Sequence, residues 1–400
     1  MKPDSAIEII QKLRDRQYEA YLVGGCVRDM VMGLEPADYD IATSARPEEI
    51  MKLFSRTEAI GAQFGVVLVI HHGHPYEVAT FRSDEAYVDG RRPTGVVFTD
   101  AKTDVLRRDF TINGLLFDPI GKTILDYVSG QKDIEAKIVR AIGDPVRRFE
   151  EDKLRILRAI RFGARLGYTI EPETWKAVCT MAPQIHQVSI ERIQGEIVRI
   201  LTEGQAGTGV RMLHDSGLLG EVFPEVRWND HLAHCLGMLE RGVASELAMA
   251  VLLHEVSVAD VERIMERLKF ARLEINHTVC LVMQIPKFHT VRDLSVAALK
   301  KFFRLLHFER HLELERICRS ASDGDLKDYE FALKTFRGWT SEDIWPKPLI
   351  TGDDLIAMEI PKGPVYKEIL SVVEDEQLEG RLTTRDAAIE FLKKRYGHKS

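Results

Sequence analysis

The first part of the chain, up to residue 144, mixes two kinds of hydrophobic pattern. Residues 4–17 repeat apolar side chains at helical spacing, whereas 21–23, 65–71 and 75–81 are short apolar or alternating runs bounded by glycine, histidine or proline. The pattern therefore predicts an α+β region in which helices pack against a mixed sheet.

A polar stretch, residues 82–99, interrupts this pattern and fits no regular element. It contains glycine and proline, and a loop of this length inside a compact domain is usually functional. Its Tyr87, Arg91 and Arg92 are candidates to meet the base and the phosphates of a substrate. A solvated surface loop is the alternative interpretation.

From Pro145 onwards the pattern is helical. Residues 147–166 predict one long amphipathic helix, 189–201 a second helix with Ser189 as its N-cap, and 300–319 a third with a basic polar face. The turn at residues 143–145 is the predicted end of the α+β region. We expect an α+β head followed by all-helical parts: head 1–144, neck 145–205, body 206–345 and tail 346–400.

Composition places the chain among ordinary globular proteins of several domains. Of its 400 residues, 45% are hydrophobic and 29% are charged. No apolar run approaches the roughly 20 residues that a membrane span needs, and the amino terminus has no signal-peptide pattern. The scattered cysteines form no CxxC pair, so we expect reduced thiols and a cytoplasmic location without membrane contact.

The formal net charge of −7 argues against a protein coated all over with nucleic acid. It leaves room for a local basic stripe that binds RNA, because phosphates respond to the charges nearest to them.

Residues 21–41 hold the strongest chemical signal. Gly24 and Gly25 stand between a predicted strand and a predicted helix over 26–32. Backbone N–H groups at such a junction favour an anion, and glycine lets a phosphate approach closely. Arg28 would add a fork of donors to the same phosphate.

Asp38 and Asp40 follow shortly afterwards and are predicted to point to the same side of an extended strand. Two carboxylates this close raise each other's pKa unless a cation lies between them, and such hard oxygen ligands suit Mg²⁺. Glu77, in a strand-like run, is either a third carboxylate at this site or a surface charge. Each motif alone is common in plain turns and loops, so the signal lies in their combination.

Two further patterns carry weaker signals. Asp152 and Arg155, three residues apart on a predicted helix, combine an acceptor with a donor. They match the Watson–Crick edge of C or A and mismatch that of U or G, although an ordinary surface salt bridge is the alternative.

His71, His72 and His74 sit at a predicted hairpin turn, where neighbouring side chains lack a shared register, so we expect a turn there and no metal site.

These motifs occur in an order typical of one family. LVGGCVRD, ADYDI, RSDEAYVDGRRP, RRDFTIN, EEDKLRILRAIRF and SIERIQGEIVRIL resemble the class II tRNA nucleotidyltransferases (CCA-adding enzymes) and the bacterial poly(A) polymerases, which share a DNA polymerase β-like nucleotidyltransferase head. The resemblance covers roughly residues 4–201 strongly and the rest weakly. Gly114 departs from the alanine usual in the family, with little effect expected.

The resemblance implies roles for individual residues. Asp38 and Asp40 would hold two Mg²⁺ ions for attack of an RNA 3′-hydroxyl on the α-phosphate of a nucleotide, with release of pyrophosphate. The other implied nucleotide-binding residues are Gly24, Gly25 and Arg28 at the triphosphate, Arg108, Asp109 and Asn113 at the sugar and phosphates, and Glu151, Asp152, Arg155 and Arg158 at the base. The loop with Tyr87, Arg91 and Arg92 would serve the switch from C to A addition.

The implied substrates are CTP, ATP and tRNA, whose acceptor and T arms the carboxy-terminal region would contact. Several alternatives stay open: a partial enzyme that adds only CC or only the final A, a poly(A) polymerase, or a non-catalytic RNA-binding protein. A phosphohydrolase is a further alternative, because His234, His254 and Glu255 fall where relatives carry a His-Asp motif. Here Glu255 replaces the aspartate, which favours a metal-free helical core.

Overall fold

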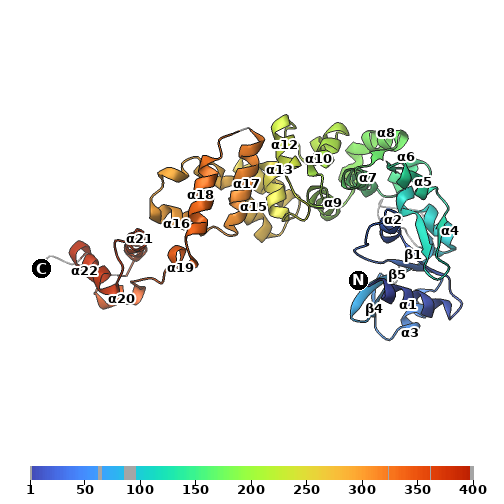
Figure 1. Ribbon diagram of the computed structural model, residues 1–400, viewed down its shortest axis with the longest axis horizontal. Helices are drawn as coiled ribbons and strands as arrows, with labels where there is room; N and C mark the ends of the chain where they lie inside the picture. Colours follow the sequence, from blue (N-terminus) through green and yellow to red (C-terminus); the bar gives the residue numbers. More distant parts are fainter. Residues whose placement is uncertain (1, 62–64, 85–95, 323, 361, 397–400) are drawn as a thin grey trace. The chain divides into compact units, whose positions relative to one another are not determined.

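The computed structural model describes residues 2–61, 65–84, 96–322, 324–360 and 362–396 (Figure 1). Two compact units divide the chain: residues 1–248 with 263–270 form the first, and residues 249–262 with 271–400 form the second. Within the described ranges, no helix combines the length and the apolar character needed to cross a membrane.

A mixed seven-stranded sheet forms the framework of the first unit, in the order β3-β4-β5-β2-β1-β8-β9. Only β2 and β5 run parallel; every other neighbouring pair in this sheet is antiparallel. The strands are β1 (Ala20–Val23), β2 (Ile41–Thr43), β3 (Thr57–Gly61), β4 (Val66–His71), β5 (His74–Thr80), β8 (Leu115–Asp118) and β9 (Thr123–Asp126). The predicted strands at 21–23, 65–71 and 75–81 are therefore confirmed.

Two small ladders are separate from this sheet. β6 (Arg82–Asp84) pairs antiparallel with β7 (Val96–Phe98), so the two ends of the polar stretch 82–99 form a short ladder that the sequence did not predict. β10 (Ile138–Val139) pairs parallel with β11 (Thr169–Ile170).

Short helices accompany the sheet. They are α1 (Pro3–Arg14), α2 (Gly25–Val31), α3 (Pro47–Leu53), α4 (Ala101–Leu106), the 3₁₀ turn η2 (Thr111–Asn113) and α5 (Gly130–Glu135). Helix α1 places Ala6, Ile9, Ile10 and Leu13 in the core at 0% exposure, as its helical spacing of apolar residues predicted. Helix α2 directly follows β1, an inner strand of the sheet, and the chain turns between them at Gly24.

A group of helices completes the first unit. It contains α6 (Pro145–Glu151), α7 (Leu154–Leu166), α8 (Pro172–Met181), η3 (Ala182–Gln187), α9 (Ile190–Thr202), α10 (Ala206–Asp215), α11 (Leu218–Val222) and α12 (Asp230–Gly237). Helix α7 packs against α9 and α10. The predicted helix beginning after Ser189 is confirmed as α9, with Ser189 at its N-cap.

The prediction of one helix over 147–166 is wrong, because the chain leaves the helical conformation at Asp152. Helix α6 ends at Glu151, and Asp152 is extended with φ −151° and ψ 103°. Its carboxylate accepts a hydrogen bond from the Leu154 backbone N–H at 3.1 Å and two from Arg192 of α9, at 3.0 and 2.7 Å. A tertiary partner therefore overrides the helical pattern at this point.

The second unit is helical in the parts described. Helices α13 (Ser245–Leu253) and α14 (Val258–Arg267) contain the boundaries between the units. Then follow α15 (Arg272–Phe288), η4 (Val291–Asp293), α16 (Val296–Phe303), α17 (Phe308–Ala321), α18 (Lys327–Gly338), α19 (Ser341–Ile344), α20 (Gly352–Ala357), α21 (Val365–Leu378) and α22 (Arg385–Tyr396). Helix α17 packs between α15 and α18 (Figure 1).

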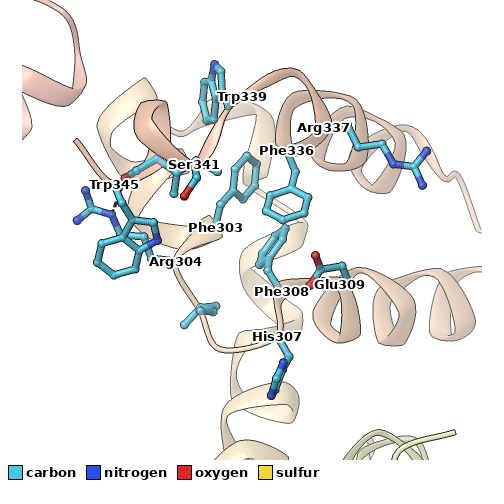
Figure 2. Close-up of a pocket in the computed structure, with 12 residues that line it drawn as sticks. Phe303, Arg304, His307, Phe308, Glu309, Phe336, Arg337, Trp339, Ser341 and Trp345 are labelled. Carbon is cyan, nitrogen blue, oxygen red and sulfur yellow. Dashed lines mark hydrogen bonds between the residues drawn. The ribbon is translucent and has the colours of Figure 1, made fainter. Parts of the chain in front are cut away.

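The predicted basic helix over 300–319 is also broken. Helix α16 ends at Phe303, and His307 adopts a left-handed conformation with φ 50° before α17 begins. A cavity of about 460 Å³ opens at this break, with Phe303, Phe308 and Phe336 at its centre and the Arg304 guanidinium 4.4 Å from the Trp345 ring centroid (Figure 2). Both Phe303 and Phe308 belong to the buried core, so packing of aromatic rings dictates the break.

Gly114 lies in closely packed surroundings between η2 and β8. A Cβ atom at this position would lie 2.8 Å from Val128 Cγ2 and 3.1 Å from Ile142 Cδ1. These neighbours have closed over the glycine, so the expectation that glycine in place of alanine matters little is not supported.

We therefore expect Gly114→Ala to lower the free energy of unfolding of the first unit by about 1–3 kcal/mol, through overpacking. Gly195→Ala is the matched control, because Gly195 is exposed on α9 with nothing within 4 Å of an added Cβ. That change should leave stability unaltered or raise it by up to about 1 kcal/mol. Urea unfolding of both variants measures the difference, and equal stability of Gly114→Ala and wild type would contradict the packing argument.

His311 is buried in the second unit without a polar partner. It is 1% exposed, and neither ring nitrogen has a hydrogen-bond partner among the described residues. Its ring stacks on Phe308 at 6.0 Å and lies 6.3 Å from His277. Burial, and then the nearby His277, lower the pKa of His311 from 6.5 to about 4.

A depressed histidine pKa stabilises the fold only while the ring is neutral. This contribution is fully present above the unfolded pKa of 6.5 and is lost as the pH falls toward about 4. Between pH 6.5 and 4, we expect His311→Phe to lose less of its free energy of unfolding than wild type does, by on the order of 3 kcal/mol. Urea unfolding at several pH values measures this difference. The exposed His289, changed to Phe, should leave the slope unaltered; an unaltered slope in His311→Phe as well would contradict this assignment.

Candidate active site

A cavity of about 560 Å³ in the first unit brings together most of the residues that the sequence singled out. Its wall comes from the β1–α2 junction, the segment before β2, the segment between α4 and η2, and helices α7 and α9. The lining residues are Gly24, Gly25, Arg28, Asp29, Ala37, Asp38, Asp40, Arg108, Asp109, Asn113, Arg158, Arg161, Phe162, Arg165, Arg199, Glu203 and Arg241.

Gly24 directly follows β1 and has a φ of 76°, a backbone conformation that residues with a side chain rarely adopt. Its backbone N–H donates to the Leu115 carbonyl at 3.3 Å, and an added Cβ would lie 3.4 Å from a terminal nitrogen of Arg108. Glycine is therefore required here by the backbone. It brings the main chain close to a guanidinium with no side chain between them, as a phosphate-binding surface needs.

Arg28 is almost fully buried, at 3% exposure, although its side chain lines the cavity. It donates to Asn113 Oδ1 at 2.8 Å and to Asp29 Oδ1 at 2.9 and 2.6 Å. Its guanidinium also lies 5.4 Å from the Phe162 ring centroid. The fork of donors that the sequence assigned to a phosphate is thus largely held by protein groups, which fix its position.

Asp38 and Asp40 both line the cavity, and the buried Tyr39 between them points into the core. They occupy an irregular segment directly before β2, so the prediction that they lie on a strand is wrong by a few residues, but the alternation it relied on is present. Burial first, and then the charges of Asp38 and Glu77, raise the pKa of Asp40 to about 6 against the opposing effect of Arg108.

Burial is the larger cause of this raised pKa, and the charges of the neighbouring carboxylates add to it. Paired carboxylate oxygens on one wall of a polar cavity are the donors that a hard divalent cation prefers, so the residues present fit such an ion. Glu77 is exposed on β5, whose Val78 pairs with Ile41 of β2. Its charge contributes to the raised pKa of Asp40, although Glu77 is not among the described residues that line the cavity.

Arg107 and Arg108 are both anchored by Asp104, a residue that the sequence analysis missed. Asp104 is 1% exposed and accepts from Arg107 at 2.7 Å and from Arg108 at 3.0 Å. Burial alone would raise the pKa of Asp104, but the two guanidinium charges outweigh it and lower that pKa. The i, i+3 and i, i+4 spacings from Asp104 were a usable signal.

Asp109 connects the cavity to helix α7. It is 8% exposed and accepts from Arg158 Nε at 2.8 Å, from Arg158 Nη2 at 2.5 Å and from Asn113 at 3.2 Å. Burial alone would raise the pKa of Asp109, but the charge of Arg158 and its hydrogen bonds lower it to about 2. The carboxylate is therefore ionised at any pH at which the protein functions.

Glu151, Asp152 and Arg155 are not among the described residues that line the cavity. Arg155 donates to Glu151 at 2.6 Å and to the Arg148 and Arg107 carbonyls at 2.8 and 2.9 Å, while Asp152 is held by Arg192. No hydrogen bond joins Asp152 to Arg155 through their side chains in this part of the structure. The two side chains that the sequence paired are thus each oriented by a separate partner.

A basic wall along α7 and α9 was not assigned from the sequence. Arg161, Arg165 and Arg199 line the cavity together with Arg241, and Glu203 is the carboxylate among them. Arg158, Arg161 and Arg165 recur at helical spacing, so a search for like charges on one helix face would have found them. Seven arginines face five carboxylates in the whole lining, which suits a polyanionic ligand.

Other predicted residues lie elsewhere. Tyr87, Arg91 and Arg92 fall outside the described residues. His234 belongs to α12, and His254 follows α13, with its Nδ1 2.8 Å from the Val251 carbonyl oxygen. The prediction of a metal-free helical core around these histidines stays a prediction.

Family models match three segments of the chain. The match over residues 20–140 is to the poly A polymerase head domain, that over 167–229 to an RNA and SrmB- binding site of polymerase A, and that over 243–392 to tRNA nucleotidyltransferase domain 2.

Individual relatives match almost the entire chain. A CCA-adding enzyme of Levilactobacillus brevis is 33% identical over 392 residues, or 96% of each chain. The crystal structure of the Bacillus stearothermophilus CCA-adding enzyme in complex with CTP aligns over 99% of each chain with a TM-score of 0.83 and 29% identity. The Thermotoga maritima CCA-adding enzyme complexed with tRNA aligns over 99% of this chain and 96% of its own, with a TM-score of 0.67, and at 18% identity shows the fold alone.

The Asp109–Arg158 pair gives a direct test of the site's electrostatics. Removing Arg158 leaves the buried carboxylate of Asp109 without its ion-pair partner, so Arg158→Ala should lower the free energy of unfolding by about 3 kcal/mol. Asp109→Ala should cost less, because Arg158 is 30% exposed and lies 3.9 Å from Glu196. The double variant should be less destabilised than the sum of the single variants by about 1–3 kcal/mol.

Arg267 and Glu225 provide the control cycle. They form a pair with 2.6 Å separation whose side chains are 41% and 27% exposed. Their coupling, measured by the same urea unfolding experiments, should stay below about 1 kcal/mol. Equal coupling in both pairs would show that burial of Asp109 and Arg158 does not strengthen their interaction.

Proposed function

Because the chain belongs to the family of CCA-adding enzymes, we propose that it adds C, C and A in turn to the 3′ end of tRNA, using CTP and ATP and releasing pyrophosphate. One observation carries the proposal. Asp38 and Asp40 lie on the wall of a cavity whose remaining wall is rich in arginine, the arrangement that nucleotidyl transfer to an RNA 3′-hydroxyl requires.

The family generally uses divalent metal ions. For this chain we propose Mg²⁺, held by Asp38 and Asp40, with Glu77 as a further carboxylate nearby. When bound, the ion would neutralise charge on the triphosphate and favour the attacking oxygen as a nucleophile. The placement of both carboxylates on one wall of the cavity supports this assignment, since a cation between them would offset their repulsion.

The protein groups around this pair would position the nucleotide. Arg108, fixed by Asp104, would contact the phosphates beside Gly24 and Gly25, which also line the cavity. Asp109 and Asn113 would border the sugar, where Asn113 is already aligned by its bond to Arg28. These groups hold fixed positions before substrate arrives, which lowers the reorganisation needed in the reaction.

Selection of C and A would rest on Asp152 and Arg155, supported by Glu151 and Arg158. An acceptor beside a donor matches the amino group and ring nitrogen of cytosine or adenine and mismatches uracil and guanine. Arg192 grips both oxygens of Asp152, and Glu151 with two carbonyls grips Arg155, so neither side chain is free to rotate toward a wrong base.

We further propose that the chain acts in the cytoplasm. Its proposed parts are a head (1–144), a neck (145–205), a body (206–345) and a tail (346–400). The tail would contact the acceptor and T arms of tRNA. All five cysteines are free thiols, as a reducing compartment favours. Lys301 and Arg304, at the end of α16, form ion pairs of 2.6 Å with Asp375 and Glu374 of the same unit, so they are poor choices for phosphate binding.

A tRNA transcript lacking its 3′ CCA, incubated with Mg²⁺ and CTP, ATP or both, tests the proposal at single-nucleotide resolution. We expect complete CCA only when both nucleotides are present. Products that stop at CC, or addition of A only to a CC-ended tRNA, would assign a partial activity. A long A tail on unrelated RNA would assign a poly(A) polymerase.

Asp38→Asn should reduce the rate of nucleotide addition at least about a hundredfold while tRNA binding persists, because the carboxylate acts on the reacting groups and not on the RNA backbone. Asp15→Asn is the matched control, since Asp15 caps the end of α1 and is not among the residues lining the cavity; it should keep full activity. Binding of tRNA by the wild type with no addition under any condition would refute the enzyme and leave an RNA-binding protein.

A further inference from the structure

A cluster of two histidines and one glutamate lies outside the cavity, where α1 meets the hairpin of β4 and β5 (labelled in Figure 1). Glu8 Oε2 is 2.7 Å from His71 Nε2 and 2.8 Å from His72 Nε2. The two imidazole rings have centroids 4.2 Å apart. One potential ligand atom from each side chain lies within 4.8 Å of the other two.

The hairpin turn brings the adjacent histidines together, contrary to the expectation that they lack a shared register. His71 ends β4 and pairs with His74, which begins β5. His72 and Gly73 form the turn with positive φ values of 48° and 79°. In extended backbone, neighbouring side chains point to opposite faces, but this left-handed turn lets both imidazoles reach the same carboxylate.

Glu8 brings the third group from a distant part of the sequence, 63 residues before His71. Within the described ranges, the hydrogen bonds of these three side chains are only those with one another. The bonds to His71 and then His72 lower the pKa of Glu8. In the part of the chain that the structure describes, the ion-pair partners of this carboxylate are the two ring nitrogens, and no lysine or arginine pairs with it.

We propose that Glu8, His71 and His72 form a binding site for a divalent transition-metal ion, with Zn²⁺ as the representative ion. Two imidazole nitrogens and one carboxylate oxygen are a donor set typical of zinc sites with three protein ligands and one position for water. The same nitrogens disfavour Mg²⁺, which prefers oxygen ligands, so this site is chemically distinct from the Asp38–Asp40 pair.

The geometry needs only a small adjustment. Ligand atoms around tetrahedral Zn²⁺ lie about 3.3 Å apart, given bond lengths of roughly 2.0–2.1 Å. The observed spacings of 2.7 and 2.8 Å must therefore open by about half an ångström. Glu8 and His72 are 54% and 61% exposed, so their side chains have room to move and water has access to the fourth position.

A metal here would fasten α1 to the β4–β5 hairpin. In the sheet, β5 lies beside β2, and β2 directly follows the segment that carries Asp38 and Asp40. The role is one of stability, because an ion that binds only the folded chain raises its midpoint of thermal unfolding. The inference does not depend on the proposed nucleotidyl transfer.

Titration of the full chain with Zn²⁺, followed by calorimetry and by thermal unfolding in excess Mg²⁺, tests the proposal. We expect wild type to bind one more Zn²⁺ than Glu8→Gln or His72→Ala, and to show a larger rise in the unfolding midpoint. Tetrahedral Co²⁺ absorption bands that appear in wild type and disappear in His72→Ala would identify the ligands directly. Because the comparison is between variants, Zn²⁺ bound elsewhere on the chain cancels.

His186→Ala is the matched control. His186 and Glu221 form a similar exposed imidazole–carboxylate contact at 2.8 Å, but they are not part of a cluster of three ligands among the described residues. This variant should bind Zn²⁺ as wild type does. Identical Zn²⁺ binding by wild type and His72→Ala, with both folded by circular dichroism, would overturn the proposal, as would an equal loss of binding in His186→Ala.

Discussion

A chain of buried charges joins the sheet of the first unit to the helices that follow it. Asp109 binds Arg158, Glu196 lies 3.9 Å from Arg158 and 2.7 Å from Arg161, and Arg161 in turn approaches Glu203 at 3.3 Å. Buried ions tolerate little misplacement, because each must keep its partner to offset its desolvation. The position of α7 relative to the sheet, and with it the shape of the cavity, depends on this chain.

The same principle accounts for the arginines of the cavity wall. Arg28 and Arg108 are each held by an acidic side chain, Asp29 and Asp104 respectively. The protein thus presents positive charge to the cavity while fixing its direction from within. Such fixed dipoles and charges stabilise a polyanion more effectively than mobile side chains, because they need not reorganise when it arrives.

Local patterns predicted the elements well and long-range partners poorly. The apolar run before Gly24, the alternation around Tyr39 and the spacing in α9 depend on neighbours in sequence, and all are present in the structure. The end of α6 depends on Arg192, 40 residues beyond Asp152, and no helical period reveals it.

The same distinction holds at the candidate site. The motifs around residues 24–40 and 108–113 mark the cavity from sequence alone, because their residue types are chemically unusual together. The bonds of Asp152 to Arg192 and of Arg155 to the Arg107 carbonyl could not be predicted from the sequence. Nor could the contact of Glu8 with the hairpin turn, since each of these contacts needs the folded arrangement of separate elements.

Gly114 has a consequence for how this sequence can change over time. Once glycine occupies the position, Val128 and Ile142 fill the volume that a methyl group would need. Alanine at this position is then better tolerated after one of those neighbours becomes smaller, so the order in which substitutions occur affects what each of them costs. The size of the residue next to Asn113 is therefore coupled to the sizes of two residues that are distant from it in the sequence.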